Sequence, residues 1–175
     1  IDHIEENPGC YIFCYKGGLR SKIAHDWLKK ENVLVQRLEG GYKKFRSYII
    51  SQHSDAKNYT KSWKVIGGLT GSGKTQLLNQ FDEAIDLEKI ANHRGSAFGK
   101  NISEQPSQAN FENIITDKYL NHRLPQIYIE DESRTIGRVT LPEPWYRKMQ
   151  RSDLIVLKIS NEKRVNNILK EYVLE

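Results

Sequence analysis

The sequence predicts an α/β protein built from two parallel-sheet parts. Three observations lead to this fold class: short apolar segments alternate with amphipathic segments, glycine loops separate them, and one loop matches the phosphate-binding consensus. Strands that alternate with helices are typical of a parallel sheet, because each parallel pair needs a crossover connection. We therefore expect one such unit on each side of a polar linker in the 175 residues.

The first part of the chain predicts the order strand, helix, strand, helix. Residues 10–14 are apolar and run into a glycine pair. Ser21 is expected to cap a helix whose apolar positions share one face. Residues 33–38 are rich in β-branched side chains and predict a second strand, and residues 42–49 predict an amphipathic helix.

A polar segment at residues 51–62 lacks apolar periodicity and is interpreted as a linker. It divides the chain into a first domain at 1–50 and a second at 63–175. The second part again alternates: we predict strands at 63–66 and 84–87, buried strands at 127–129 and 154–159, and helices at 75–81, from Pro106-Ser107 onward, and at 165–173.

Composition excludes several classes of protein. A mean hydropathy of −0.66 and the lack of an 18-residue apolar run predict no membrane span. No secretory signal is recognised, and two cysteines are too few for a disulfide scaffold, so we expect a globular cytoplasmic protein. The chain starts at Ile1 and its only methionine is Met149, which predicts processing or a longer parent protein.

The phosphate loop is the most specific motif. Residues 68–75 fit G-x-x-x-x-G-K-[ST] between a predicted strand and a predicted helix. Glycines allow backbone N–H groups to surround phosphate oxygens, and the lysine adds a positive charge. Whether the phosphate belongs to a nucleotide stays open. The predicted phosphate ligands are Gly68, Gly71, Ser72, Gly73, Lys74 and Thr75.

A magnesium ion beside this loop would need oxygen ligands. The Thr75 hydroxyl can join such a shell, and an acidic residue should lie at the end of a neighbouring strand. Asp131 is the first candidate and Asp86 the second. Either could equally be an ordinary carboxylate at a strand end.

A cysteine loop is the second chemical centre. Cys14 follows a predicted strand and precedes a tight glycine loop and a helix start, an environment that favours the thiolate. It suits a nucleophile or sulfur carrier, although the spacing to Arg20 also fits a cysteine-dependent phosphatase loop; Cys10 is interpreted as a buried apolar residue. The expected anion ligands are Lys16, Gly17, Gly18, Arg20 and Ser21.

Together these motifs resemble the tRNA 2-selenouridine synthase family, in which a rhodanese-like domain is fused to a phosphate-loop domain. Lys16 is a departure, because the family usually has arginine there. The similar strings lie at residues 14–21, 37–46, 67–75, 86–88, 91–99, 105–108, 130–139 and 141–144.

The resemblance implies the C-terminal part of a rhodanese-like domain, followed by a P-loop NTPase-like parallel-sheet domain that lacks its own C-terminal part. It implies conversion of wobble 2-thiouridine to 2-selenouridine in tRNA through an S-geranyl intermediate, with selenophosphate and geranyl diphosphate as co-substrates. Cys14 would be the catalytic residue for selenium transfer. The phosphate loop would bind diphosphate, together with Mg²⁺ on Thr75 and Asp131.

Four polar-loop residues are candidate contacts for phosphate or tRNA: His93, Arg94, Arg134 and Arg138. Surface ion pairing is the alternative for the arginines, and a local hydrogen bond for the histidine. The segment 16–46 has nine basic and three acidic residues, so it could track an RNA backbone or be a solvated helix face.

Two other functions remain open from the residues alone. The phosphate loop also fits a nucleotide-dependent kinase or switch with an appended sulfurtransferase domain. The basic segment also fits a nucleic-acid-binding module without catalysis, for which neither Cys14 nor Lys74 would be needed.

Overall fold

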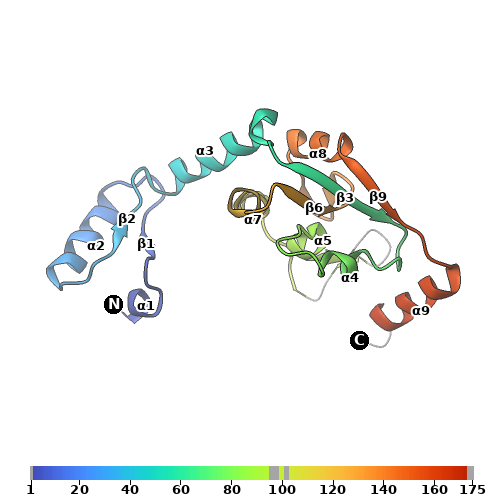
Figure 1. Ribbon diagram of the computed structural model, residues 1–175. Coiled ribbons are helices and arrows are strands. Elements are labelled where there is room, and N and C mark those ends of the chain that lie inside the picture. Colours follow the sequence, from blue (N-terminus) through green and yellow to red (C-terminus); the bar gives the residue numbers. More distant parts are fainter. Residues whose placement is uncertain (1, 95–98, 101–102, 173–175) are drawn as a thin grey trace. The chain divides into compact units, whose positions relative to one another are not determined.

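The computed structural model describes residues 2–94, 99–100 and 103–172, and it is a mixed α/β structure with a parallel sheet, as predicted. The chain divides into two compact units, residues 1–51 and 52–175. Figure 1 shows the elements of both units in chain order. No helix among the described residues is both long and apolar enough to span a bilayer.

The N-terminal unit contains a βαβ arrangement. Strands β1 and β2 pair in parallel, with Tyr11 opposite Gln36, and the connection between them passes through α2. The parallel pairing predicted from the strand and helix order is therefore confirmed. The elements are α1 (Asp2–Glu6), β1 (Tyr11–Ile12), α2 (Leu19–Lys30), β2 (Gln36–Arg37) and α3 (Gly41–Ser54).

Two predictions for this unit are wrong in detail. Both strands are two residues long, much shorter than the apolar segments that predicted them. Helix α2 starts at Leu19 with Gly18 at its N-cap, so Ser21 is not the cap. The hydroxyl of Ser21 instead donates to the carbonyl of Gly18 and lies beside the sulfur of Cys14, which places it in the loop's own hydrogen-bond network.

The polar segment 51–62 is more regular than a linker. Helix α3 continues to Ser54, and Ala56–Asn58 forms a 3₁₀ helix, η1. Tyr59 is then buried, and its hydroxyl donates to the carbonyl of His53. Tyr59 and His53 are buried while most other side chains of the segment are exposed or half-buried, a pattern too short to produce apolar periodicity.

The C-terminal unit is organised around a parallel sheet with the strand order β6–β3–β9, whose strands lie side by side in Figure 1. Its central strand, β3, leads into the phosphate loop and then α4. The elements are β3 (Ser62–Gly68), α4 (Lys74–Leu78), α5 (Leu87–Ala91), β4 (His93–Arg94), β5 (Gly99–Lys100), α7 (Gln108–Asn121), β6 (Gln126–Glu130), β7 (Thr135–Ile136), β8 (Val139–Thr140), α8 (Glu143–Gln150), β9 (Asp153–Leu157) and α9 (Asn161–Tyr172).

Two predicted strands of this unit need correction. Residues 84–87 contribute one bridge, at Ile85, to the outer side of β6, because Asp86 then caps helix α5 by accepting from the amide of Lys89. Strand β9 was expected to be buried, but in the described structure Leu154, Ile155 and Val156 are largely exposed, since β9 lies at the edge of the sheet. Helix α4 also ends at Leu78, three residues earlier than predicted.

The core of this unit combines the sheet with an aromatic cluster. Trp63 on β3 and Trp145 on α8 pack edge to face, with ring centroids 4.9 Å apart, and Tyr59 and Tyr119 complete the cluster. Such pairs add to the hydrophobic stabilisation from burial. Helix α7 contributes Phe111 and Ile115, both fully buried, and it begins after its N-cap Ser107, where a helix start was predicted.

Two glutamines fasten the β7–β8 hairpin, which the sequence did not predict. The Gln105 amide donates to the carbonyls of Ala91 and Ile136 and accepts from the amide of Arg138. Gln108 exchanges two hydrogen bonds with the backbone of Thr140. These contacts give the string at 105–108 a structural role.

Phe111→Ala should destabilise the C-terminal unit by about 3–5 kcal/mol, because it leaves a cavity in the core. Leu120→Ala on the same helix is the matched control: Leu120 is 42% exposed and Phe111 is 0% exposed. The control should cost about 0.5 kcal/mol or less. Urea unfolding followed by circular dichroism measures both, and equal losses would contradict the assigned core.

Candidate functional site

The cysteine loop is held by its own backbone. The carbonyl of Cys14 accepts hydrogen bonds from the amides of Gly17 and Tyr42, both at 3.2 Å, and the carbonyl of Tyr15 accepts from Lys43 at 2.8 Å. Gly17 has a φ of 64°, and a Cβ there would lie 2.5 Å from the amide nitrogen of Gly41. Only glycine fits this close approach of two turns.

The sulfur of Cys14 lies among hydrogen-bond donors. The Ser21 hydroxyl is 3.3 Å away, and this contact, with the backbone amides of Ser21, Gly18 and Gly17, lowers the pKa of the Cys14 thiol to about 7. Burial has a smaller opposing effect. A large fraction of the thiol is therefore thiolate at neutral pH, the form that acts as a nucleophile.

The cysteine loop contains two basic residues that were predicted as anion ligands, and a third contacts it from β2. Lys16 and Arg20 are exposed beside it. Arg37, which the sequence analysis did not single out, donates from its guanidinium to the carbonyl of Gly17 at 2.8 Å. Arg37 thus holds the loop from β2, and it was missed because it is distant in sequence.

The phosphate loop lies where the motif predicted, between β3 and α4. Gly68, Gly71 and Gly73 have φ values of 151°, 76° and 88°, which side chains rarely adopt. The Lys74 ammonium donates to the carbonyl of Gly68 at 3.2 Å. The hydroxyl of Ser72 is buried and has no hydrogen-bond partner among the described residues, so a donor is left for an anion in the loop.

Helix α9 also supports this loop. Arg164 donates to the carbonyl of Thr70 at 3.1 Å, and Asn167 donates to the carbonyl of Gly71 at 2.9 Å. Between α4, α9 and the end of β9 lies a cavity of about 400 Å³ that adjoins the loop at Ser72 and Gly73. Its lining is mixed: the apolar part comes from Leu77, Leu157 and Ile159, and the polar part from Gln76, Gln80, Lys163, Asn166 and Asn167.

Asp131 is positioned at the phosphate-loop end of the sheet. Its amide donates to the carbonyl of Ile66 at 2.9 Å, and its carboxylate lies close to Gly67, where an added Cβ would be 3.0 Å from Oδ2. Asp86 instead caps α5. Asp131 with the Thr75 hydroxyl therefore offers the oxygen donors that Mg²⁺ prefers.

The candidate tRNA contacts are less uniform. Arg134 pairs with Glu143 at 2.8 Å, so an anion would compete with that carboxylate. Arg138 is exposed in the β7–β8 turn. His93 lies against Gly137, and its Nδ1 is buried without a hydrogen-bond partner among the described residues. Arg94 belongs to β4, but its side chain lies outside the described part of the structure.

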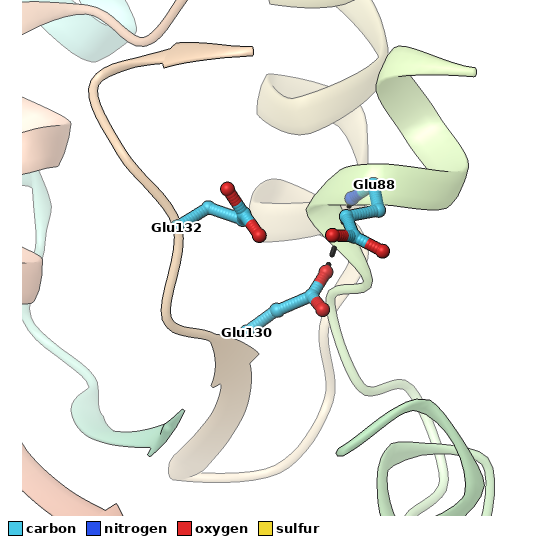
Figure 2. A group of neighbouring side chains, drawn as sticks. All are labelled: Glu88, Glu130 and Glu132. Atoms are coloured by element: carbon cyan, nitrogen blue, oxygen red, sulfur yellow. Dashed lines mark hydrogen bonds between the residues drawn. The ribbon is translucent and has the colours of Figure 1, made fainter. Parts of the chain in front are cut away.

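A cluster of three glutamates was missed by the sequence analysis. Figure 2 shows the side chains of Glu88, Glu130 and Glu132 gathered together. One carboxylate oxygen from each lies within 4.8 Å of the others. Burial, followed by the negative charges of Glu88 and Asp86, raises the pKa of Glu130 to about 9. The strings at 86–88 and 130–139 contained these carboxylates, but nothing in their spacing indicated that the side chains meet.

Comparison with known proteins covers nearly the whole chain. The family model described as the tRNA 2-selenouridine synthase AAA domain matches residues 61–175. A tRNA 2-selenouridine synthase from Shewanella frigidimarina is 43% identical over 99% of this chain and 48% of the relative. A second tRNA 2-selenouridine synthase, from Shewanella oneidensis, is 44% identical over 99% of this chain and 46% of the relative. The chain spans about half the length of these curated relatives, and no solved structure matches it.

Alkylation of Cys14 by iodoacetamide, measured in a Cys10→Ser background, should follow a pH midpoint of about 7, because only the thiolate reacts. Ser21→Ala removes the largest stabilising contact, so the midpoint should move upward. Ser47→Ala is the matched control, since that hydroxyl donates to a helix carbonyl in the same unit. If Cys14 in the loop with Ser21 intact were alkylated with the pH midpoint of an ordinary thiol, the assigned geometry would be contradicted.

Proposed function

Because this chain belongs to the tRNA 2-selenouridine synthase family, we propose that it is part of an enzyme that converts wobble 2-thiouridine in tRNA to 2-selenouridine. The proposal includes an S-geranyl intermediate formed from geranyl diphosphate, and selenophosphate as the selenium donor. Its main structural support is the presence of two anion-binding loops in one chain, one of them around a thiol with a lowered pKa. The rhodanese-like character of the N-terminal unit is part of this proposal.

The cysteine loop would serve selenium transfer. The backbone amide of Gly18, with Lys16 and Arg20 nearby, would bind the phosphate group of selenophosphate, while the Gly17 amide holds the loop through the carbonyl of Cys14. Cys14 would then lie beside the selenium as a thiolate, with Ser21 hydrogen-bonded to it. Lysine at position 16 preserves the positive charge of the family's arginine but cannot make its bidentate contact.

The phosphate loop would bind the diphosphate of geranyl diphosphate. In the geranylation step the sulfur of 2-thiouridine forms a bond to geranyl carbon, the carbon–oxygen bond breaks, and diphosphate leaves with the electron pair. Lys74 and the unpartnered Ser72 hydroxyl would stabilise the charge that develops on this leaving group. Thr75 and Asp131 would hold Mg²⁺, which supplies further positive charge when bound.

The cavity beside the loop suits the hydrocarbon part of the same substrate. It begins at Ser72 and Gly73, where the diphosphate would lie, and continues along Leu77, Leu157 and Ile159. Burying an isoprenoid chain against these side chains would favour binding by the hydrophobic effect.

Two substitutions in the full-length protein should separate the two steps. Lys74→Ala should lower geranylation about 10²–10³-fold, because it removes a positive charge that stabilises the leaving diphosphate. Cys14→Ala should remove 2-selenouridine while S-geranylated 2-thiouridine still forms. Nucleoside mass spectrometry of 2-thiouridine tRNA incubated with both co-substrates measures each product.

Lys89→Ala is the control for Lys74→Ala, since Lys89 is exposed on α5 and its amide still closes the Asp86 cap. If the unsubstituted protein formed neither 2-selenouridine nor S-geranylated 2-thiouridine, the proposal would be contradicted. Tight binding and turnover of ATP or GTP, with indifference to geranyl diphosphate, would instead favour the nucleotide-dependent kinase or switch.

Ile159→Trp should fill the cavity without reaching the loop. The KM for geranyl diphosphate should rise about tenfold or more, because the isoprenoid chain loses its apolar contacts, while the affinity for inorganic diphosphate should stay within about twofold. Isothermal titration and initial-rate measurements test the two values. If the substitution weakened the binding of geranyl diphosphate and of inorganic diphosphate equally, the isoprenoid chain would not lie in this cavity.

A further inference from the structure

The three glutamates beside the phosphate loop form a site of their own. Glu130 ends β6, Glu132 lies two residues further, and Glu88 comes from the first turn of α5 (Figure 2). Their carboxylate oxygens converge to within 4.8 Å of one another. Ionised carboxylates at this distance repel one another, so either a proton or a bound cation must offset the negative charge.

The burial of Glu130 is a separate observation that points to a ligand. Its side chain is 1% exposed, and Oε2 accepts a hydrogen bond from the amide of Glu88 at 3.1 Å. The other oxygen, Oε1, is buried and has no hydrogen-bond partner among the described residues. This holds whether the group is ionised or carries a proton, and an unsatisfied buried polar atom of this kind is costly.

Nearby described basic groups make contacts elsewhere. Arg134 pairs with Glu143, which also pairs with Arg147. Among the described side chains, no lysine or arginine is recorded in an ion pair with Glu130 or Glu132. A cation would therefore offset the negative charge of these two carboxylates and give Oε1 of Glu130 a partner.

We propose that Glu88, Glu130 and Glu132 bind a divalent metal cation of the oxygen-preferring class, such as Mg²⁺ or Ca²⁺, next to the phosphate loop. Carboxylates are the usual protein ligands of these cations, and water would fill the remaining coordination positions. The absence of thiol or imidazole from the three ligands argues against zinc or copper.

This site is distinct from the proposed magnesium shell of the diphosphate. Glu130 and Asp131 are consecutive, and consecutive side chains of an extended segment point to opposite sides. Asp131 faces Gly67 on β3, whereas Glu130 faces Glu88 on α5. The cation would tie the first turn of α5 to the end of β6 without any bound substrate.

Metal binding should be measured on metal-free full-length protein in the absence of diphosphate. Electron paramagnetic resonance of Mn²⁺ gives the number of bound ions, and the thermal midpoint in Mg²⁺ or Ca²⁺ reports stabilisation of the folded protein. We expect one bound Mn²⁺ and a rise in the midpoint. Glu130→Gln keeps the side-chain shape and the hydrogen bond from Glu88, and it should weaken Mn²⁺ binding about tenfold or more.

Glu132→Gln provides a second test at a half-buried position, where folding is less at risk. It should weaken binding in the same direction. Asp131→Asn should leave this ion bound within about twofold while reducing the additional Mn²⁺ taken up with inorganic diphosphate. Glu162→Gln, an exposed acidic residue on α9, is the matched control and should change neither.

Three results would overturn the proposal. One is the absence of any bound Mn²⁺ without diphosphate at about 10 mM metal. Another is unchanged binding in both Glu130→Gln and Glu132→Gln, and the third is loss of all binding in Asp131→Asn, which would assign the ion to the phosphate-loop shell. None of these bears on selenation or geranylation, so the proposed function would stand.

Discussion

The pairing of β3 with β6 is the interaction on which the chemistry of the C-terminal unit depends. Parallel strands end at the same edge of a sheet, so the register of Ile66 with Glu130 brings the phosphate loop and the acidic residues after β6 together. Asp131 reaches the loop through its amide bond to Ile66. A shift of one residue would exchange the directions of Glu130 and Asp131 and remove both candidate cation sites.

The two loops meet similar electrostatic demands in different ways. The cysteine loop uses backbone amides and the Ser21 hydroxyl to favour a thiolate, and its glycines allow the turn at Gly17 to pack against the turn at Gly41. The phosphate loop offers Lys74 and the buried Ser72 hydroxyl, and contacts from α9 hold its carbonyls. In both, the chain's own backbone supplies the shape and a few side chains supply the charge.

Local features could be predicted because their cause is local. The phosphate loop, the start of the helix at residues 106–107 and the buried strand at 127–129 follow from residue types at fixed spacing. The exposure of β9 and the single-residue bridge at Ile85 did not follow, because burial depends on what packs against a segment. The cap prediction at Ser21 failed because helix α2 begins at Leu19, so Ser21 lies within its first turn and not at the N-cap.

The sequence by itself determined where the cysteine loop and the phosphate-loop motif lie, with Cys14 and Lys74 in them, and the alternation that makes a parallel sheet. Only the tertiary structure decided which distant residues join them: Arg37 on the carbonyl of Gly17, α9 on the phosphate loop, and Glu88 against Glu130. The reason is physical. Backbone conformation and local hydrogen bonds depend on neighbours in the chain, whereas the meeting of side chains 42 residues apart depends on the register of strands and the packing of helices.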